Sequence, residues 1–286
     1  LGLTVFDSLD LNKLIDYIDW TPFFQTWELH GKFPAILRDD VVGVEATKLF
    51  EDAQSMLTSM VNESWVKAKA IFGLFPANSM GDDIEFTHTN GGNQVAFVQR
   101  SLRQQTKKAI GQSNIALSDF IASKDCGIQD YVGAFVVCTG IGLEEHIERF
   151  EKDYDDYSSI MVKALADRLA EALAEYLHQL VRTDYWAYEH VHSFSKEELI
   201  QEKYRGIRPA PGYPACPDHL EKLTIFQALN ATESIGVSLT ESLAMTPASS
   251  VSGWYFAHPD AKYFGLGKIT EEQVYDMANR KNESYD

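Results

Sequence analysis

The chain has 286 residues, of which 45% are hydrophobic, 23% charged and 12% aromatic. That composition is typical of a globular protein with a sizeable core, in one large domain or two modest ones. The net charge of −17 leaves no overall positive field for nucleic acid and disfavours anionic membranes, so we expect neither as a partner.

The N-terminal part is predicted to contain two helical segments. Residues 11–18 are expected to form a short helix or turn that leads to Asp19 and Trp20, because Pro22 disfavours helical geometry in the residue before it. Residues 42–62 carry apolar side chains at helical spacing, which predicts a longer helix.

Strands are predicted in the middle of the chain. Residues 67–75 form an apolar segment that we expect to end as a strand at Pro76, and residues 83–88 alternate between apolar and polar side chains. A turn at 78–82 would join these two strands in a hairpin. Residues 130–139 are mostly apolar, which predicts a buried strand.

The longest predicted helix covers residues 143–180. Apolar side chains, mostly leucines, recur down one face of its C-terminal part, and a second stripe on this part is polar. A polar stripe of this kind is most often a solvated helix face, which is what we expect for its members: Asp167, Glu171, Glu175 and His178.

The C-terminal third mixes short elements. A capping box at Ser195–Glu198 predicts a helix over 196–204, and residues 218–227 are expected to form another short helix. Residues 252–256 are strand-like, and a second capping box at Thr270–Gln273 begins the last helix. Because strands and helices do not alternate strictly, we expect an α+β fold with a mainly antiparallel, curved sheet.

The three cysteines, Cys126, Cys138 and Cys216, are too few and too scattered for a disulfide framework or a four-thiolate zinc site. We therefore expect reduced thiols in a cytoplasmic protein. Cys138 falls in the apolar run 133–140 and is predicted to lie in the core. No apolar run approaches the ~20 residues that span a bilayer, and aspartates near the N-terminus disfavour a signal peptide.

Conventional catalytic motifs are absent from the sequence. It contains no Gly-x-Gly-x-x-Gly, Walker or His-Glu-x-x-His motif. His190 and His192 could form a metal pair, but they lack an obvious third ligand. Cys216 near His219 could suggest a thiol hydrolase, but flanking prolines and the missing third group disfavour it. The absence of an acid, base or nucleophile set favours a protein that binds and positions a reactive cofactor.

The segment 208–219, which reads Arg-Pro-Ala-Pro-Gly-Tyr-Pro-Ala-Cys-Pro-Asp-His, contains four prolines in twelve residues. Each proline restricts φ and removes a backbone donor, so we predict a stiff loop. This loop holds Arg208 beside Tyr213 and His219, and a guanidinium can bind a carboxylate or phosphate through two parallel hydrogen bonds. A structural crossover with a solvated arginine is the alternative, and both interpretations remain open.

Three motifs occur in order along nearly the whole chain. They are Tyr17-Ile-Asp-Trp-Thr-Pro-Phe-Phe24, then Tyr204-Arg-Gly-Ile-Arg208-x-x-x-Gly212-Tyr213, and finally Ala244-Met-Thr-Pro-Ala-Ser-Ser-Val-Ser-Gly-Trp-Tyr-Phe256 continued by Lys262-Tyr263-Phe264. Together they resemble the S-adenosylmethionine-binding activation domain of cobalamin-dependent methionine synthase. The resemblance implies one C-shaped domain over residues 1–286, built around a twisted, mainly antiparallel sheet with flanking helices.

The resemblance also implies a ligand site. Asp19 would take the amino group of S-adenosylmethionine, and Arg208 would take its carboxylate. The other implied contacts come from the proline-rich loop and from two aromatic residues beside the adenosyl part: Pro209, Ala210, Gly212, Tyr213, Tyr263 and Phe264. From the residues alone, Asp19 could instead cap a turn, and the aromatic pair could belong to the core. Many relatives have two tyrosines where this chain has Tyr263-Phe264, so a contact through the second hydroxyl is missing.

By the same resemblance, the chain would act with the cobalamin-binding module of methionine synthase. One electron from flavodoxin or a similar reductase regenerates cob(I)alamin, which then takes the methyl group of S-adenosylmethionine. Asp167 and Glu171 are possible contacts with the cobalamin module. The chain lacks the family's Asp-x-His-x-x-Gly cobalamin motif and cysteine zinc site, so alone it is not expected to make methionine. The alternative function is an S-adenosylmethionine sensor or docking module without methyl transfer.

A basic cluster close together in the sequence could serve an acidic flavodoxin as a docking patch: Arg100, Arg103, Lys107 and Lys108. A solvated helix face is the alternative interpretation of these residues.

Overall fold

The computed structural model describes residues 1–88, 94–190 and 194–284, apart from the side chain of Glu197. It confirms the predicted α+β domain with an antiparallel, curved sheet. The sheet contains β1 (Gly2–Leu9), β2 (Lys67–Met80), β3 (Asp83–Phe86), β4 (Phe97–Arg100), β5 (Asp130–Ile141) and β8 (Ser250–Tyr255), and a separate pair is formed by β6 (Ser238–Leu239) and β7 (Met245–Thr246).

The helices flank this sheet. They are α1 (Thr21–Thr26), α2 (Gly43–Asn62), α3 (Leu143–Lys152), α4 (Asp156–Leu180), α5 (Lys196–Ile200), α6 (Glu221–Leu229), α7 (Ala231–Ile235) and α8 (Glu271–Lys281). A π-helical turn, Val181–Tyr185, continues α4, and 3₁₀ turns occur at Leu11–Tyr17, Ala35–Arg38, Leu117–Phe120 and Lys124–Cys126. In the described part of the chain, no helix combines the length and apolarity needed to cross a membrane.

The long strand β2 organises the sheet. The strands lie in the order β4-β3-β2-β5-β8, and β1 pairs with the first half of β2 on the edge that β3 occupies further along. All these pairings are antiparallel. The central strands are covered on both faces, which explains why β5 is apolar along most of its length rather than alternating.

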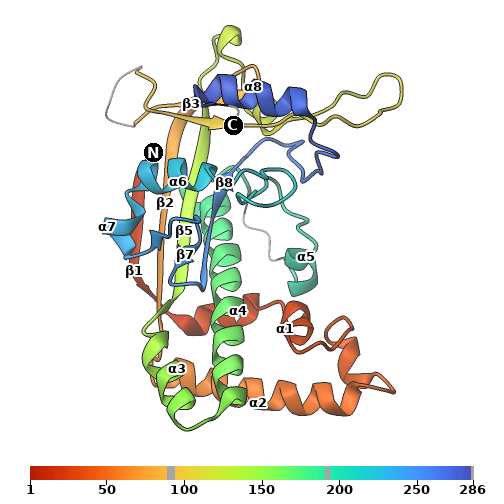
Figure 1. Cartoon of the computed structure of the whole chain (residues 1–286), viewed down its shortest axis with the longest axis vertical. Helices are drawn as coiled ribbons and strands as arrows, with labels where there is room; N and C mark the ends of the chain where they lie inside the picture. The colour runs from red at the N-terminus through yellow and green to blue at the C-terminus, as the bar shows by residue number, and fades with distance from the viewer. Residues whose placement is uncertain (89–93, 191–193, 285–286) are drawn as a thin grey trace.

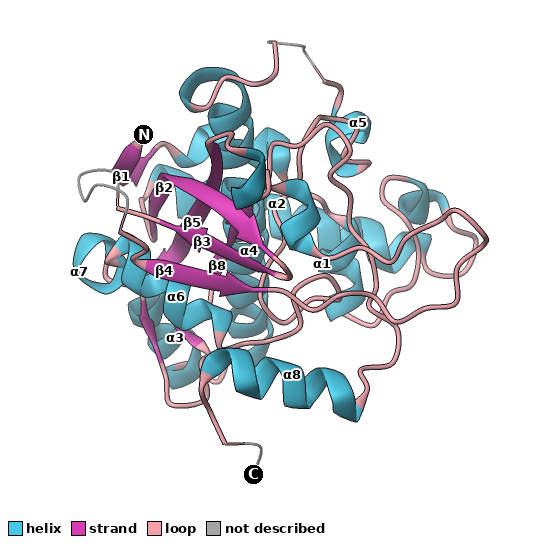
Figure 2. Cartoon of the chain, turned by 90° about the horizontal axis from the view of Figure 1, so that it is seen from above, coloured by secondary structure: helices cyan, strands magenta, loops and turns pink. Residues whose placement is uncertain are grey.

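Two hydrophobic cores lie on opposite faces of the sheet. Phe135 and Val137 of β5 point into the core shared with α2 and α4, whereas Ala134 and Val136 point into the core shared with α6 and α7. This division follows from the two-residue side-chain period of a strand. Figure 2 shows the strands from above, with α6 and α7 along one side.

The sheet and α4 form a spine, and elements at both ends project to the same side of it (Figure 1). At one end lie α1 and α2. At the other end, the loop that follows β4 extends from the body, and α8 crosses beside it. The cleft described below opens between these two ends, where the first and last thirds of the chain meet α4 and α5.

Two predicted boundaries are wrong for identifiable reasons. Strand β2 continues past Pro76 to Met80. The carbonyl of Pro76 accepts a hydrogen bond from Thr87, so Pro76 faces the β3 side of the strand, just beyond the last β2–β3 pair. The missing N–H of Pro76 therefore removes no hydrogen bond between the paired residues of β2 and β3. The predicted helix 143–180 is two helices, since Tyr154 has φ +56° and Asp155 then caps α4 by accepting from the backbone of Ser158.

Other predictions hold with shifted ends. Both capping boxes are confirmed, at Ser195 with Glu198 and at Thr270 with Gln273. The helix that follows Ser195 stops at Ile200, four residues earlier than predicted, and the helix expected at 218–227 is α6.

Candidate functional site

The proline-rich loop runs beside β8 like a further, irregular strand. Ile207 exchanges two backbone hydrogen bonds of 3.0 Å with Phe256, and Trp254 donates a 3.0 Å bond to the carbonyl of Pro209. A Cβ at Gly253 would lie only 2.8 Å from that carbonyl oxygen, so the close approach requires glycine. The backbone of Arg208 is thereby held against the centre of the domain.

Gly212 makes the turn that follows. Its φ is +98°, its amide donates a 2.8 Å hydrogen bond to the carbonyl of Cys216, and a Cβ there would lie 2.4 Å from the ring of His219. Gly212 is not among the residues that line the cleft described next. Its predicted contact with a ligand therefore stays a prediction, and its structural role is to close the loop.

Two adjoining cavities, of about 400 Å³ and about 590 Å³, form one cleft with two lobes. Both are lined by Glu171, Glu202, Arg208 and Tyr213. The first, the polar lobe, is completed by Asp16, Tyr17, Asp19, Pro22, Arg168, Glu175, Lys196, Leu199 and Ile200. The second, the apolar lobe, is completed by Phe135, Pro209, Ala210, Pro214, Ala215, Val251, Tyr263, Phe264 and Gly265.

The structure thus brings together residues that the sequence separates widely. Asp19 lies in the polar lobe, whereas Pro209, Ala210, Tyr263 and Phe264 line the apolar lobe. Arg208 and Tyr213 line both lobes, and of the eight predicted residues only Gly212 lines neither.

Arg208 is anchored inside the cleft by its Nη1 atom. That atom lies 2.7 Å from Oε2 of Glu175 and 3.5 Å from Nδ1 of His178, and it donates a hydrogen bond to the hydroxyl of Tyr204. Burial by itself would lower the pKa of Arg208, but the carboxylate of Glu175 raises it, and the net direction is upward. The guanidinium therefore remains positively charged at any physiological pH.

A second arginine lies behind the first. Arg182, in the π-helical turn, is fully buried; its Nε donates a 2.8 Å hydrogen bond to Glu189, and its Nη1 lies 3.7 Å from Oε1 of Glu175. Its guanidinium also lies over the ring of Tyr204, 3.7 Å from the centroid. Glu175 consequently stands between two arginines, with one carboxylate oxygen toward each.

The polar stripe of α4 is only partly the solvated face that its spacing predicts. Asp167 and Glu171 are exposed, but Glu175 and His178 are buried. His178 stacks on Tyr255 with ring centroids 5.0 Å apart. Burial, with Arg182 and Arg208 nearby, lowers the pKa of His178 well below its usual value, so the ring is neutral. The buried part of the stripe is the part that contacts Arg208 of the proline-rich loop, through Glu175 and His178.

Asp19 follows the first 3₁₀ turn and precedes α1. Its Oδ1 accepts a 2.9 Å hydrogen bond from the amide of Thr21, so the capping role is present. Trp20, Phe23 and Phe24 are buried on either side of this amide and fix the position of the carboxylate. The bond to Thr21 uses only one carboxylate oxygen of Asp19. The other oxygen, Oδ2, has no hydrogen bond to any described residue, so it is available to a ligand in the polar lobe.

Tyr263 joins the two motif segments. Its hydroxyl accepts a 3.0 Å hydrogen bond from the backbone amide of Arg208, and burial raises its pKa to about 12. Phe264 packs at the edge of the second core, 6.4 Å from Phe120 between centroids. Phe264 thus packs against the core, whereas Tyr263 is partly exposed, and both line the apolar lobe. Their contact with an adenosyl group stays a prediction.

Several residues at the site were not predicted as site residues. Among them, Glu175 and Glu202 line the cleft, and Tyr204 contacts Arg208 and Glu175 from outside the lining. Although much of Glu202 is exposed, partial burial of its carboxyl raises its pKa, an effect that Arg208 opposes. Glu175 belongs to the polar stripe, and Tyr204 belongs to the motif that contains Arg208. The sequence patterns therefore included both residues but did not indicate that they contact Arg208. No local pattern marks Glu202.

The two residues suggested as contacts with another module differ in position. Glu171 lines both lobes of the cleft. Asp167 lies outside the lining of both lobes and accepts a 2.6 Å hydrogen bond from Ser249. Neither contact is tested by the structure of the chain alone.

The alternative sites gain no support. Cys216 is buried, and burial raises the pKa of its thiol well above the usual value, which leaves it protonated. Of the possible metal pair, His192 lies outside the described residues. Within the described ranges, no group of three or more histidine, cysteine, aspartate or glutamate residues could hold a metal ion.

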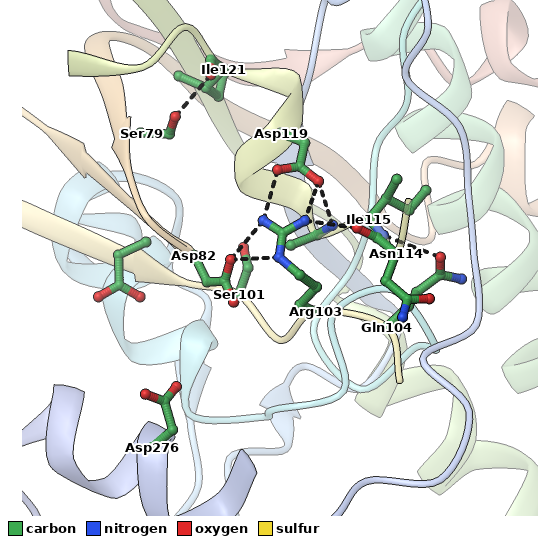
Figure 3. Close-up of polar contacts among 12 residues, drawn as sticks. Ser79, Asp82, Ser101, Arg103, Gln104, Asn114, Ile115, Asp119, Ile121 and Asp276 are labelled. Atoms are coloured by element: carbon green, nitrogen blue, oxygen red, sulfur yellow. Dashed lines mark hydrogen bonds and ion pairs between the residues drawn. The ribbon is translucent and has the colours of Figure 1, made fainter. Parts of the chain in front are cut away.

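The predicted basic cluster is not a single patch. Arg103 is clamped between Asp82 and Asp119 at 2.6–2.9 Å, as Figure 3 shows. Arg100 donates two hydrogen bonds to the carbonyl of Arg280. Both arginines therefore serve the structure. Two members of the cluster, Lys107 and Lys108, remain exposed, on a loop rather than on the helix face considered as the alternative.

Comparisons with known proteins agree on one family. The family model for the activation domain of vitamin B12 dependent methionine synthase matches residues 10–282. A solved structure, the crystal structure of the MetH reactivation domain bound to AdoHcy, is 52% identical in sequence. The match covers 100% of this chain and 87% of that one, with a TM-score of 0.95.

Proposed function

The chain belongs to the family of vitamin B12 dependent methionine synthase activation domains, and we propose that it binds S-adenosylmethionine and positions its methyl group for transfer to cob(I)alamin during reductive reactivation. The main support for the proposal is the two-lobed cleft. Its polar lobe contains several carboxylates and the cations Arg168, Lys196 and Arg208, of which only Arg208 also lines the apolar lobe. The binding of AdoHcy by the related reactivation domain supports it, because AdoHcy is S-adenosylmethionine without the methyl group.

The chemistry of the cleft fits each part of the ligand. Arg208 matches its carboxylate and Asp19 its ammonium group, both in the polar lobe. The apolar lobe, with Tyr263 and Phe264, suits the adenosyl part. Glu171 and Glu202 line both lobes, which is where a sulfonium between the amino acid and the adenosine would lie.

The contribution of the protein is position rather than acid–base chemistry. A sulfonium is already a good leaving group, and holding the methyl group in line with its acceptor can supply roughly 7–11 kcal/mol. The sulfonium charge disappears during transfer, so the carboxylates of Glu171 and Glu202 favour the substrate over the neutral product. They therefore strengthen substrate binding and assist product release, without favouring the transition state.

Cobalamin, held by another module, supplies the nucleophilic cobalt that accepts the methyl group. This chain has no Asp-x-His-x-x-Gly segment to provide a cobalt ligand. We accordingly expect the chain alone to bind S-adenosylmethionine and not to make methionine. Methyl transfer that appears only when a cobalamin module is added would distinguish this function from that of a sensor.

Calorimetric titration of S-adenosylmethionine into the parent chain and the Arg208→Ala variant tests the proposal. Loss of a charge-assisted contact costs about 1.5–3 kcal/mol, roughly ten- to over a hundredfold in affinity. Lys203→Ala is the matched control, because it removes an exposed cation from the same segment. No binding by the parent, even with a cobalamin module present, would refute the proposal. Equal binding by the parent and Arg208→Ala would remove Arg208 from the site.

The proposal extends to an acidic reductase such as flavodoxin as electron donor. On a chain of net charge −17, Lys107 and Lys108 form an exposed basic pair at a projecting loop. Replacing both with glutamate should slow reductase-driven reactivation and reduce its dependence on salt, while S-adenosylmethionine binding stays unchanged. An unchanged reactivation rate would remove this loop from the docking surface.

A further inference from the structure

The guanidinium of Arg208 is fixed by contacts to a single one of its nitrogen atoms. Among the described residues, all its hydrogen bonds and ion pairs run through Nη1, whose partners are Glu175, Tyr204 and His178. The Nε and Nη2 donors make none. These two atoms form the edge from which a guanidinium donates two parallel hydrogen bonds to a carboxylate. The anchored arginine therefore keeps one complete donor edge for a ligand.

Glu175 is itself fixed from behind. Its Oε2 faces Nη1 of Arg208 and accepts a 3.1 Å hydrogen bond from Tyr204, while its Oε1 faces Arg182. Arg182 is fully buried and is held in turn by Glu189. The carboxylate consequently has little room to rotate away from Arg208.

Stability alone does not account for this arrangement. Buried ion pairs lose solvation, and well-packed apolar residues often stabilise a fold as well or better. A buried carboxylate that orients an arginine at the wall of a cleft has a functional explanation, because an arginine fixed beforehand loses less conformational freedom when a ligand binds.

We propose that Glu175, together with the Tyr204 hydroxyl, is a positioning residue that holds Nη1 of Arg208 so that its Nε–Nη2 edge is presented to the carboxylate of the ligand. This inference rests on the proposed function and goes beyond it by assigning the residues behind the clamp. Neither residue is proposed to touch the ligand carboxylate. Both act through Arg208.

The test compares two ligands that differ only in the carboxylate. S-adenosylmethionine and decarboxylated S-adenosylmethionine are titrated calorimetrically into the parent chain and the variants Glu175→Gln and Tyr204→Phe. Glu85→Gln is the matched control, since Glu85, on β3, is a half-buried glutamate that pairs with Lys124 and does not line the cleft.

Glu175→Gln should weaken S-adenosylmethionine binding about tenfold or more, because a charged hydrogen-bond partner of Arg208 is lost. Tyr204→Phe, which removes a single hydroxyl, should weaken it by about threefold to tenfold. Binding of the decarboxylated ligand should change by less than about twofold in each variant, and Glu85→Gln should leave both ligands unaffected. A loss confined to the ligand with the carboxylate is what action through Arg208 requires.

Three outcomes separate the possibilities. Equal losses for both ligands would overturn the inference, because they would indicate a general structural role. Unchanged or tighter S-adenosylmethionine binding by Glu175→Gln would also overturn it, since Glu175 would then be idle or would compete with the ligand. Failure of the parent to bind S-adenosylmethionine would refute the proposed function itself. If Glu175→Gln does not fold, Tyr204→Phe decides by the same comparison.

Discussion

The backbone amide of Arg208 donates a 3.0 Å hydrogen bond to the side-chain hydroxyl of Tyr263. This bond joins the proline-rich loop to the segment 263–265, and both line the apolar lobe. The bond therefore links the proposed carboxylate-binding arginine to the ring that we propose lies beside the adenosyl part. A change at either residue should be felt at both ends of the ligand.

Tyr263→Phe removes this bond and keeps the ring. We expect S-adenosylmethionine affinity to fall about threefold to tenfold, because a neutral hydrogen bond contributes about 0.5–1.5 kcal/mol. Calorimetry measures the loss. Tyr154→Phe is the control, since Tyr154 is almost fully exposed and makes no described contact with the cleft. Affinity equal to that of the parent would mean that the loop is held by its pairing with β8 alone.

Asp19→Asn separates the two roles of this residue. Asparagine can accept the same hydrogen bond from the amide of Thr21 that aspartate accepts, so the melting temperature should barely change. The affinity for S-adenosylmethionine should fall about tenfold or more, because the contact with the ammonium group loses its charge. Asp10→Asn is a matched control, since Asp10 also caps a turn but does not line the cleft. A large fall in melting temperature with unchanged affinity would leave Asp19 only as a cap.

Glu221→Gln should make stability less dependent on pH. Burial raises the pKa of Glu221 to about 8, although Lys281 opposes this, and its Oε2 has no hydrogen-bond partner among the described residues. Between its ordinary pKa of 4.5 and about 8, the unfolded chain loses a proton that the folded chain keeps, so parent stability falls as pH rises. Glutamine resembles the protonated acid and avoids this loss.

Thermal unfolding at pH 5 and pH 9 checks this prediction. The variant should match the parent at pH 5 and exceed it at pH 9 by about 1–3 kcal/mol, the usual cost of an unsatisfied buried polar group. Glu241→Gln, at an exposed position, should follow the parent at both values. If Glu221→Gln follows the parent at pH 9 as well, the carboxyl of Glu221 is already ionised near its ordinary pKa.

Thiol labelling tests the hydrolase alternative. Cys126 is exposed, whereas Cys138 and Cys216 are buried. A maleimide should therefore modify one thiol per native chain and three in denaturant, as counted by mass spectrometry, and S-adenosylmethionine binding should survive labelling. Rapid modification of Cys216 in the native chain would reopen a role for its thiol.

Much of the architecture follows from local patterns. The apolar run of β5, the helical spacing of α2 and α4 and both capping boxes were predictable, because strand and helix periods and capping hydrogen bonds depend on residues close in sequence. The wrong predictions of element boundaries occur where a contact between residues far apart in the sequence determines the structure. Pro76 does not end β2 because its nitrogen faces the side on which β3 has already ended, and no pattern around Pro76 reveals where β3 stops.

The site divides in the same way. By itself, the sequence determined the stiff loop that carries Arg208, the family motif that contains it and the polar residue types that a zwitterionic ligand requires. Only the tertiary structure decided that Asp19 and Arg208 line one polar lobe. It also decided that Arg103 forms ion pairs inside the protein, and that Glu175 is buried against Arg208 rather than solvated. The physical reason is that a charge acquires its role from the groups that burial brings to it, and those groups come from segments far apart in the chain.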